Sequence, residues 1–294
     1  MNYRHAFHAG NFADVMKHAI LVKVLDCLRR KPAPFRFIDT HAGIGVYDLA
    51  SDAGERSLEW RDGIGRLIAP DGLASLATDG VASSAAAILA PYLEIVAAVN
   101  RAREASALRF YPGSGEIARR LLRADDTAVL NELHPVDAKT LQDHMRGDKR
   151  VKTLSIEGWH AVKSLLPPKE RRGVTLIDPP FEAAGEFQRL EAALSEADKR
   201  FAAGIIMLWY PIKAGGDAAR FEKRLAGGGV RRLLRAELLV RHPEQPGRLN
   251  GSGLVIRNAP YGLDGELDVL LPWLAERLAQ GRGARGRTEW LVGE

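Results

Sequence analysis

Residues Gly173 to Phe181 read Gly-Val-Thr-Leu-Ile-Asp-Pro-Pro-Phe. Residues 173–177 are mostly apolar and predict a buried strand. Pro179 ends that strand because proline has no N–H for the ladder, and Pro180 biases Pro179 away from the helical region. An acid, two peptide carbonyls and an aromatic ring are therefore expected at the carboxyl edge of a sheet.

This tetrapeptide, residues 178–181, suits a flat base that carries an exocyclic amino group. Asp178 and a loop carbonyl, that of Pro179, would accept the two N–H bonds of the amino group, and Phe181 would stack on the ring. The alternative is a strand that ends in an ordinary turn, with Phe181 in the core.

Strands alternate with helices on both sides of this stretch. Asn11 is expected to cap a first helix that ends near Arg30, and residues 40–45 are expected to form a tight turn that opens a helix. Strands are predicted over residues 35–39, 108–111, 127–131, 151–155, 173–177, 205–210, 233–240, 253–257 and 289–292. Such alternation indicates an α/β fold, with a mostly parallel sheet that helices cover on both faces.

Residues 52–105 differ in kind from this alternation. Asp, Gly, Ala and Ser are frequent there, residues 85–99 have a helical pattern, and no strand is evident. We interpret 52–105 as a helical insertion subdomain within a main domain formed by 1–51 and 106–294. The alternative is a long connection that contains two helices.

Four acids follow predicted strands, namely Asp39, Glu132, Glu157 and Asp178. Ligands bind outside the carboxyl ends of such strands, which makes these acids candidate site residues. Glu132 would bind the two hydroxyls of a ribose, or else it is a helix-start acid stabilised by the helix dipole. Glu157, followed by Gly158, would face an adenine, or it is equally a first-turn helix acid.

Two glycine-containing turns supply further candidates. In residues 39–45, Asp-Thr-His-Ala-Gly-Ile-Gly, glycine allows the backbone to approach a ligand closely. The third glycine of the dinucleotide fingerprint is replaced by Asp48, which favours a small nucleoside over a phosphate cradle. His41 would contact that ligand or cap the helix. Ser114, within residues 111–115, is a ligand candidate or a helix-start residue.

Composition narrows the class of protein. The chain has 294 residues, 46% of them hydrophobic and 27% charged, as in soluble globular proteins. Its net charge of +5 mildly favours a polyanionic partner. The single cysteine excludes a disulfide framework, and His134 and His144 lack a metal-ligand spacing, so we expect no metal. No apolar stretch approaches the ~18 residues of a membrane span, and no secretory signal opens the chain, so we expect a cytoplasmic protein without a membrane partner.

The opening of the chain carries a specific resemblance. Residues 3–18 read Tyr-Arg-His-Ala-Phe-His-Ala-Gly-Asn-Phe-Ala-Asp-Val-Met-Lys-His and resemble the start of the bacterial RlmJ family, class I S-adenosylmethionine-dependent methyltransferases. Similar landmarks recur at residues 39–43, 111–114, 132–135, 209–211 and 252–253. The Asp-Pro-Pro-Phe motif is shared with many N-methyltransferases. The resemblance covers essentially the whole chain.

The resemblance implies a Rossmann-like seven-stranded sheet with a helical insertion. It also implies methyl transfer from S-adenosylmethionine to the N6 amino group of an adenine in 23S ribosomal RNA, with S-adenosylhomocysteine as the product. We further expect a monomer. Asp178 is then the catalytic acid within the loop that includes Pro179, Pro180 and Phe181. The expected cofactor contacts are His18, His41, Ser114, Glu132, Glu157 and Gly158.

On the substrate side the resemblance implies Tyr3, and we expect Arg4, His5 and Lys17 to contact RNA. Lys17 would meet a phosphate, or it lies on a solvated helix face. Two departures from the family pattern are Glu157, where aspartate is common, and Phe181, where tyrosine is common. Three rival functions are a DNA adenine-N6 methyltransferase, a non-catalytic RNA-binding module and a nucleotide-dependent oxidoreductase, the last disfavoured by the incomplete glycine pattern.

Overall fold

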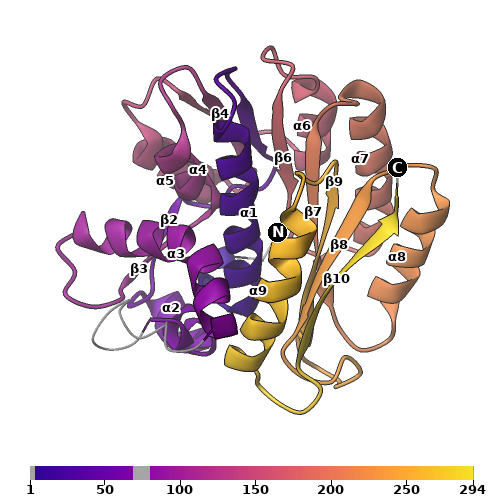
Figure 1. Ribbon diagram of the computed structural model, residues 1–294. Coiled ribbons are helices and arrows are strands. Elements are labelled where there is room, and N and C mark those ends of the chain that lie inside the picture. Colours follow the sequence, from indigo (N-terminus) through magenta and orange to yellow (C-terminus); the bar gives the residue numbers. More distant parts are fainter. Residues whose placement is uncertain (1–3, 69–79, 294) are drawn as a thin grey trace.

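One eight-stranded sheet forms the centre of the computed structural model, which describes residues 4–68 and 80–293 (Figure 1). The strand order is β10-β8-β9-β7-β6-β1-β4-β5. The strands are β1 Arg36–Asp39, β4 Thr127–Asn131, β5 Val151–Leu154, β6 Gly173–Ile177, β7 Ile205–Ile212, β8 Leu233–Leu239, β9 Gly251–Arg257 and β10 Arg285–Val292. The five adjacent strands β5, β4, β1, β6 and β7 are parallel. Strand β9 runs antiparallel to both of its neighbours, β7 and β8. The predicted α/β class is therefore confirmed.

The sheet has one strand more than the seven that the family resemblance implies. The additional strand is β10, which pairs antiparallel with β8 at the edge of the sheet. Cross-strand ion pairs join the two strands, with Arg287 Nε 2.7 Å from Glu237 Oε1 and Arg235 paired with Glu289. Opposite charges on facing strands stabilise such a pairing, and they help to hold β10 in the sheet.

Helices cover the sheet on both faces, as Figure 1 shows. One apolar cluster contains residues of α1, α3, α4, α5 and α9, and a second contains residues of α6, α7 and α8. The helices of the main alternation are α1 Phe12–Arg29, α4 Ser114–Leu121, α5 Pro135–Met145, α6 Gly158–Leu165, α7 Glu186–Arg200, α8 Asp217–Gly227 and α9 Leu263–Arg277. No helix within the described ranges is long and apolar enough to cross a membrane.

Helix α1 begins where the sequence predicts. A short 3-10 turn, η1 His5–Phe7, precedes it, and the side chain of Asn11 then accepts hydrogen bonds from Ala13 N at 2.9 Å and Asp14 N at 3.0 Å. These bonds satisfy N–H groups that have no partner inside the helix. The helix is buried along most of its length and delivers residues 14, 17 and 18 to the carboxyl edge of the sheet.

The prediction of a helix directly after Gly45 is wrong. The chain instead forms a two-stranded antiparallel ribbon of β2 Val46–Asp48 and β3 Phe110–Pro112. Gly45 has a φ of +87°, which turns the backbone into the ribbon, and its carbonyl accepts a bond of 2.8 Å from Gly113 N. The ribbon is a pairing between segments distant in the chain, which local sequence patterns do not show.

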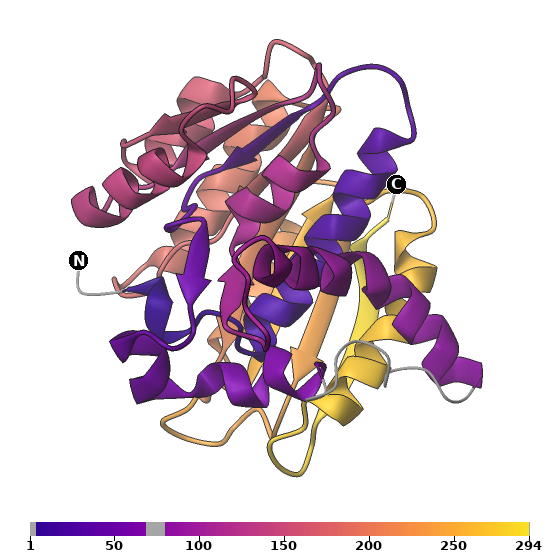
Figure 2. The same cartoon turned by 90° about the vertical axis from the view of Figure 1, so that its left-hand side faces the viewer.

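Between the two ribbon strands the described chain is helical, as predicted for residues 52–105. The elements are α2 Asp52–Ser57, η2 Glu59–Asp62, η3 Ile64–Arg66 and α3 Gly80–Arg101 (Figure 2). Leu89, Tyr92 and Val96 of α3 are buried in the same apolar cluster as α1 and α9. The division into an insertion subdomain and a main domain stays a prediction.

Candidate active site

The Asp178 loop lies beside helix α1. Asp178 follows β6, and Lys17 of α1 places its Nζ 2.5 Å from Asp178 Oδ2 and 2.8 Å from Asp14 Oδ1. Phe181 has a φ of +47°, so the loop bends through a conformation that non-glycine residues seldom adopt. The Asp178 side chain is 14% exposed and Lys17 only 5% exposed. The catalytic candidate is thus held from the side by a buried ammonium group.

The ammonium group of Lys17 is charged and donates to two carboxylates. Burial alone would lower the pKa of Lys17, but the carboxylates of Asp14 and Asp178 outweigh burial and raise it. The alternative that Lys17 lies on a solvated helix face is therefore wrong, whereas contact of Lys17 with an RNA phosphate stays a prediction. The side chain is buried and its proton-bearing nitrogen already donates to two carboxylates.

The residues that precede α1 also contact acids of the protein. His5 Nε2 lies 2.9 Å from Asp14 Oδ2, which in addition accepts a bond of 3.0 Å from Gly10 N. Arg4 Nη2 lies 2.8 Å from Asp137 Oδ1 on α5. Contacts of Arg4 and His5 with RNA stay predictions, and Tyr3 lies outside the described residues.

Aromatic rings form the wall beyond Pro180. The ring centroid of Phe181 lies 5.0 Å from that of Phe187 and 5.8 Å from that of Trp209, both in edge-to-face contact. Trp209 is fixed by a bond of 2.9 Å from its Nε1 to Ser252 Oγ. Phe181 therefore packs partly against the core, which is the alternative considered for it above, and it also lines the larger of the two cavities described below. Stacking of Phe181 on a base stays a prediction.

The turn after β1 forms the other half of the site. Ser114 Oγ donates to Asp39 Oδ2 at 2.5 Å, and His41 N donates to Asp39 Oδ1 at 3.1 Å. Burial raises the pKa of Asp39 to about 6, while the two hydrogen bonds act in the opposite direction. Ser114 thus positions Asp39, and Ser114 itself lines the adjoining pocket.

Glu132 closes this turn from the next strand. Its Oε2 accepts from Gly43 N at 2.9 Å and its Oε1 from His134 N at 2.8 Å. Burial raises the pKa of Glu132, although both hydrogen bonds favour the charged form. A carboxylate has about four acceptor sites, so two remain for hydroxyl groups of a ligand.

His41 and Gly158 fit closely together. A Cβ atom at Gly158 would lie 2.4 Å from His41 Nε2, so only glycine leaves the imidazole in place. Burial lowers the pKa of His41 to about 4, which keeps the ring neutral at neutral pH. Glu157 caps α6, because its side chain accepts a hydrogen bond of 2.9 Å from His160 N. This is the helix-start role considered above as the alternative to a cofactor contact. A cofactor contact of Glu157 stays a prediction.

His18 belongs to a buried chain of hydrogen bonds. Its Nδ1 lies 2.8 Å from the hydroxyl of Tyr111, which in turn lies 2.9 Å from the hydroxyl of Tyr92 on α3. Burial lowers the pKa of His18 to about 3. A neutral imidazole is therefore fixed from behind by residues of β3 and α3.

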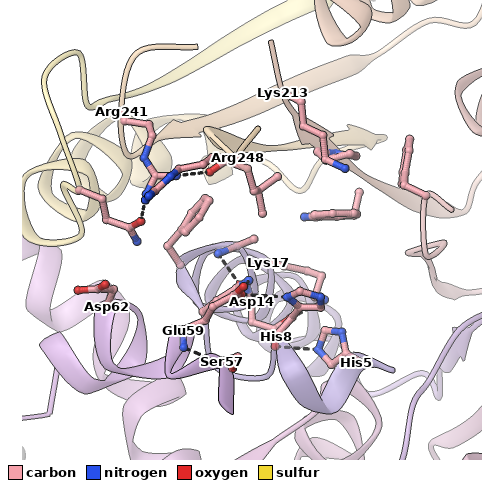
Figure 3. A pocket seen from close by; sticks show the side chains of 18 of the residues that line it. His5, His8, Asp14, Lys17, Ser57, Glu59, Asp62, Lys213, Arg241 and Arg248 are labelled. Carbon is pink, nitrogen blue, oxygen red and sulfur yellow. Dashed lines mark hydrogen bonds and ion pairs between the residues drawn. The ribbon is translucent and has the colours of Figure 1, made fainter. Parts of the chain in front are cut away.

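Two cavities meet at Asp178. The larger, of about 910 Å³, is a groove between α1, the residue 57–62 segment and the loops after β7 and β8 (Figure 3). The smaller, of about 50 Å³, is lined by His18, His41, Gly43, Ser114, Glu132 and His134, among others. His5, Lys17, Asp178 and Pro180 line both. A reacting group at Asp178 is therefore within reach from either side.

Comparison with known proteins gives the family. The sequence profile described as "Ribosomal RNA large subunit methyltransferase D, RlmJ" matches residues 32–292. The chain belongs to the RlmJ family. Relatives named ribosomal RNA large subunit methyltransferase J, from Escherichia coli and Haemophilus influenzae, are each 37% identical to it over the full length of both chains. A crystal structure of a Legionella pneumophila protein is 29% identical, with a TM-score of 0.83 over 96% of this chain and 98% of that one.

In this member of the RlmJ family, sequence reasoning did not assign Asp14 or Trp209 to the site. Asp14 lies three residues before Lys17, which places both on one helix face. This spacing is the feature of the sequence that indicates an ion pair between them. Trp209 is on the strand beside β6, but the pairing of β6 with β7 is visible only in the structure. Within residues 4–68 and 80–293, no group of three His, Cys, Asp or Glu side chains is arranged to hold a metal ion.

Proposed function

We propose that this chain transfers a methyl group from S-adenosylmethionine to the N6 amino group of an adenine in 23S ribosomal RNA. The observation that carries the proposal is the place of Asp178 and Pro180, which line both an open groove of about 910 Å³ and the smaller pocket behind it. A polymer that bears the acceptor base fits the groove, and a methyl donor fits the pocket side. Membership of a ribosomal RNA methyltransferase family supports this reading.

The residues of the smaller pocket fit S-adenosylmethionine. Glu132 retains acceptor sites for the ribose hydroxyls, and His134 Nδ1 is buried at the pocket with no hydrogen-bond partner among residues 4–68 and 80–293. A buried polar atom of this kind calls for a partner. The pocket, about 50 Å³, is smaller than known ligand sites, so lining side chains must move apart on binding. When bound, S-adenosylmethionine supplies a methyl group on a positively charged sulfur, already activated for transfer to nitrogen.

Asp178 and its neighbours orient the acceptor. Lys17 occupies Asp178 Oδ2, which leaves Oδ1 to accept one N6–H bond of adenine, and the Pro179 carbonyl accepts the other. Both bonds favour electron density on a nitrogen that is otherwise a poor nucleophile. The nitrogen would form one new bond to the methyl carbon as the bond from that carbon to sulfur breaks and its electron pair stays on sulfur. The nitrogen would lose one proton, which Asp178 Oδ1 would accept. Alignment is the main contribution, and the base must leave its stack to reach the loop.

The decisive experiment compares Asp178→Ala and Asp178→Asn with the unchanged protein. Methyl transfer to ribosomal RNA is measured with labelled cofactor, and cofactor binding is measured by calorimetry. We expect both variants to lose transfer and to bind cofactor. Near wild-type turnover by Asp178→Ala would refute the assignment of Asp178, and an absence of cofactor binding by the unchanged protein would favour a non-catalytic RNA-binding module.

The identity of the substrate needs a separate measurement. N6-methyladenine is mapped by mass spectrometry in ribosomal RNA from cells with and without this protein. We expect one adenine of 23S RNA to be methylated only when the protein is present. Preferred methylation of DNA over RNA of the same sequence would favour the DNA methyltransferase instead. We also propose that the protein is a monomer that acts in the cytoplasm, a reducing compartment that the free thiol of Cys27 fits.

A further inference from the structure

The two walls of the large groove differ in charge, as Figure 3 shows. One wall, from residues 5–17 and 57–62, carries histidines and carboxylates that are paired with each other or with nearby cations. The opposite wall carries three cations, Lys213, Arg241 and Arg248, which we call the basic wall. This difference in charge raises the question of which anion binds to the basic wall.

The basic wall is built at the same edge of the sheet as Asp178. Lys213 directly follows β7, Arg241 lies two residues after β8, and Arg248 lies in the loop that leads to β9. Ile212 and Leu239 both pair with Gly251, so the ends of β7 and β8 flank the start of β9. Because β7 is parallel to β6, its carboxyl end lies beside the Asp178 loop.

Hydrogen bonds hold the two loops of the basic wall in place. The Asn250 side-chain amide donates to the carbonyls of Pro243 and Gln245 at 2.7 Å each, and Asn250 N donates to Ile212 O at 2.8 Å. Glu244 Oε2 accepts from Gly215 N at 3.0 Å and so joins the loop after β8 to the loop after β7. The cations therefore project from a backbone that is fixed before any ligand arrives.

Arg241 is the buried charge of the three. It is 6% exposed, and its guanidinium donates to Leu249 O at 2.7 Å and to the side-chain oxygen of Gln280. Both acceptors are neutral, and across the described residues Arg241 forms no ion pair with a carboxylate. A buried charge without a counter-ion is unfavourable. Burial, followed by the neighbouring charge of Arg248, lowers the pKa of Arg241, while the carboxylates of Asp62 and Glu59 act in the opposite direction. The arginine stays charged.

Lys213 and Arg248 are exposed, and in the part of the chain that the structure describes neither forms an ion pair. The acids across the groove are already engaged. Glu59 Oε2 lies 3.0 Å from His8 Nδ1 and accepts a bond of 3.0 Å from Asn11, and Asp62 accepts from Arg66 Nε at 3.1 Å. The positive charge of the basic wall is therefore left for a ligand.

We propose that Lys213, Arg241 and Arg248 bind the phosphodiester backbone of the RNA strand whose adenine enters the Asp178 loop. The inference rests on the proposed function and deepens it, because it assigns the phosphate contacts to the loops after β7 and β8. The N-terminal cations are less suited to that task, since Lys17 is paired with Asp14 and Asp178 and Arg4 is paired with Asp137. Phosphate contacts position a nucleic acid without reading its sequence.

The experiment measures RNA affinity against salt for Lys213→Gln, Arg248→Gln and the double variant. The probe is a fluorescent fragment of 23S ribosomal RNA, and the control is Lys223→Gln, an exposed lysine on α8 with the same change of charge. We expect each single variant to weaken RNA binding about threefold to tenfold. The slope of log K against log salt should fall by about 0.7 for each contact to a single-stranded segment. Cofactor affinity should be unchanged.

Equal RNA affinity and equal salt slopes for the double variant and Lys223→Gln would overturn the inference. Arg241→Met is tested alongside, with Arg241→Lys as the charge-retaining variant, and its melting temperature shows whether it folds. If it does not, the double variant still decides. Failure of the proposed function is seen separately, as an absence of methyl transfer by the unchanged protein, whereas the inference fails only in the binding measurements on the variants.

Discussion

Lys17 Nζ lies 2.5 Å from Asp178 Oδ2, which joins the first helix of the chain to a loop 161 residues later. Asp14 holds the same ammonium group from the other side at 2.8 Å. One oxygen of Asp178 thereby accepts from Lys17, and the other can accept a hydrogen bond from the amino group of a base. This arrangement determines the orientation of the group on which the proposed chemistry depends.

Replacing Lys17 by methionine tests that arrangement. Lys17→Met removes the ammonium group that Asp14 and Asp178 share and leaves Asp14 with His5 and Gly10 N as hydrogen-bond partners, and loss of one partner from a buried ion pair is strongly destabilising. We expect methyl transfer to fall at least tenfold and the melting temperature to fall as well. Steady-state kinetics and thermal unfolding measure the two effects.

A second variant separates rate from stability. In Lys17→Met combined with Asp14→Asn, one carboxylate that lost its ammonium partner is gone, so we expect the melting temperature to recover in part while the rate stays low. Recovery of the rate together with the melting temperature would contradict an orienting role for Lys17.

The close fit of Gly158 to His41 predicts a specific loss of cofactor binding. A methyl group at Gly158 would lie 2.4 Å from His41 Nε2, so Gly158→Ala must displace the imidazole from the pocket wall. We expect the affinity for S-adenosylmethionine, measured by calorimetry, to fall about tenfold or more. The matched control is Gly265→Ala, where a Cβ meets nothing within 4 Å. Equal cofactor affinity in the two variants would show that His41 has no part in binding.

The raised pKa of Asp39 predicts a dependence of stability on pH. The carboxyl group has an ordinary pKa of 3.8 and is raised to about 6 by burial in the folded state. Between these values the folded protein keeps a proton that the unfolded chain has released, so stability falls as pH rises. The loss is about 3 kcal/mol at most and is complete above pH 6.

Asp39→Asn removes this titration. Relative to the unchanged protein, the variant is expected to gain unfolding free energy steadily from about pH 4 to pH 6.5, as followed by urea unfolding at each pH. A difference between the two proteins that stays constant over this window would contradict the shift. Ser114→Ala, which keeps Asp39, should retain the pH dependence.

The cap of helix α1 predicts a modest effect on stability. Asn11→Ala removes the two bonds to Ala13 N and Asp14 N, and we expect the unfolding free energy to fall by about 1 kcal/mol. Asn11→Ser keeps a capping oxygen and should lose less. Urea unfolding compares the three proteins, and an unchanged midpoint for Asn11→Ala would indicate that the cap is compensated by other contacts.

Local patterns in the sequence predict what local interactions determine. The apolar run before Asp178, the cap at Asn11 and the alternation of strands and helices all correspond to elements of the structure. Glu132 was placed at a strand end for the same reason. Each of these features depends on residues within a few positions of one another.

The rest depends on pairings between distant segments. The burial of Lys17 is set by Asp178, and the ribbon that replaces the predicted helix after Gly45 requires residues 110–112. Arg241 is defined by its bonds to Leu249 and Gln280, which no periodicity indicates. For such residues the type of side chain is visible in the sequence, but its surroundings are not.

The ribbon of β2 and β3 has a consequence for the evolution of this fold. Because Val46 pairs with Pro112 and Asp48 with Phe110, the chain leaves and re-enters the catalytic edge at neighbouring points. Doubling the length of such an excursion raises its closure entropy by only about 0.6 kcal/mol. A change of length in an exposed part of this excursion therefore costs little, whereas the part of α3 that carries Leu89, Tyr92 and Val96 must be kept because it packs against α1 and α9.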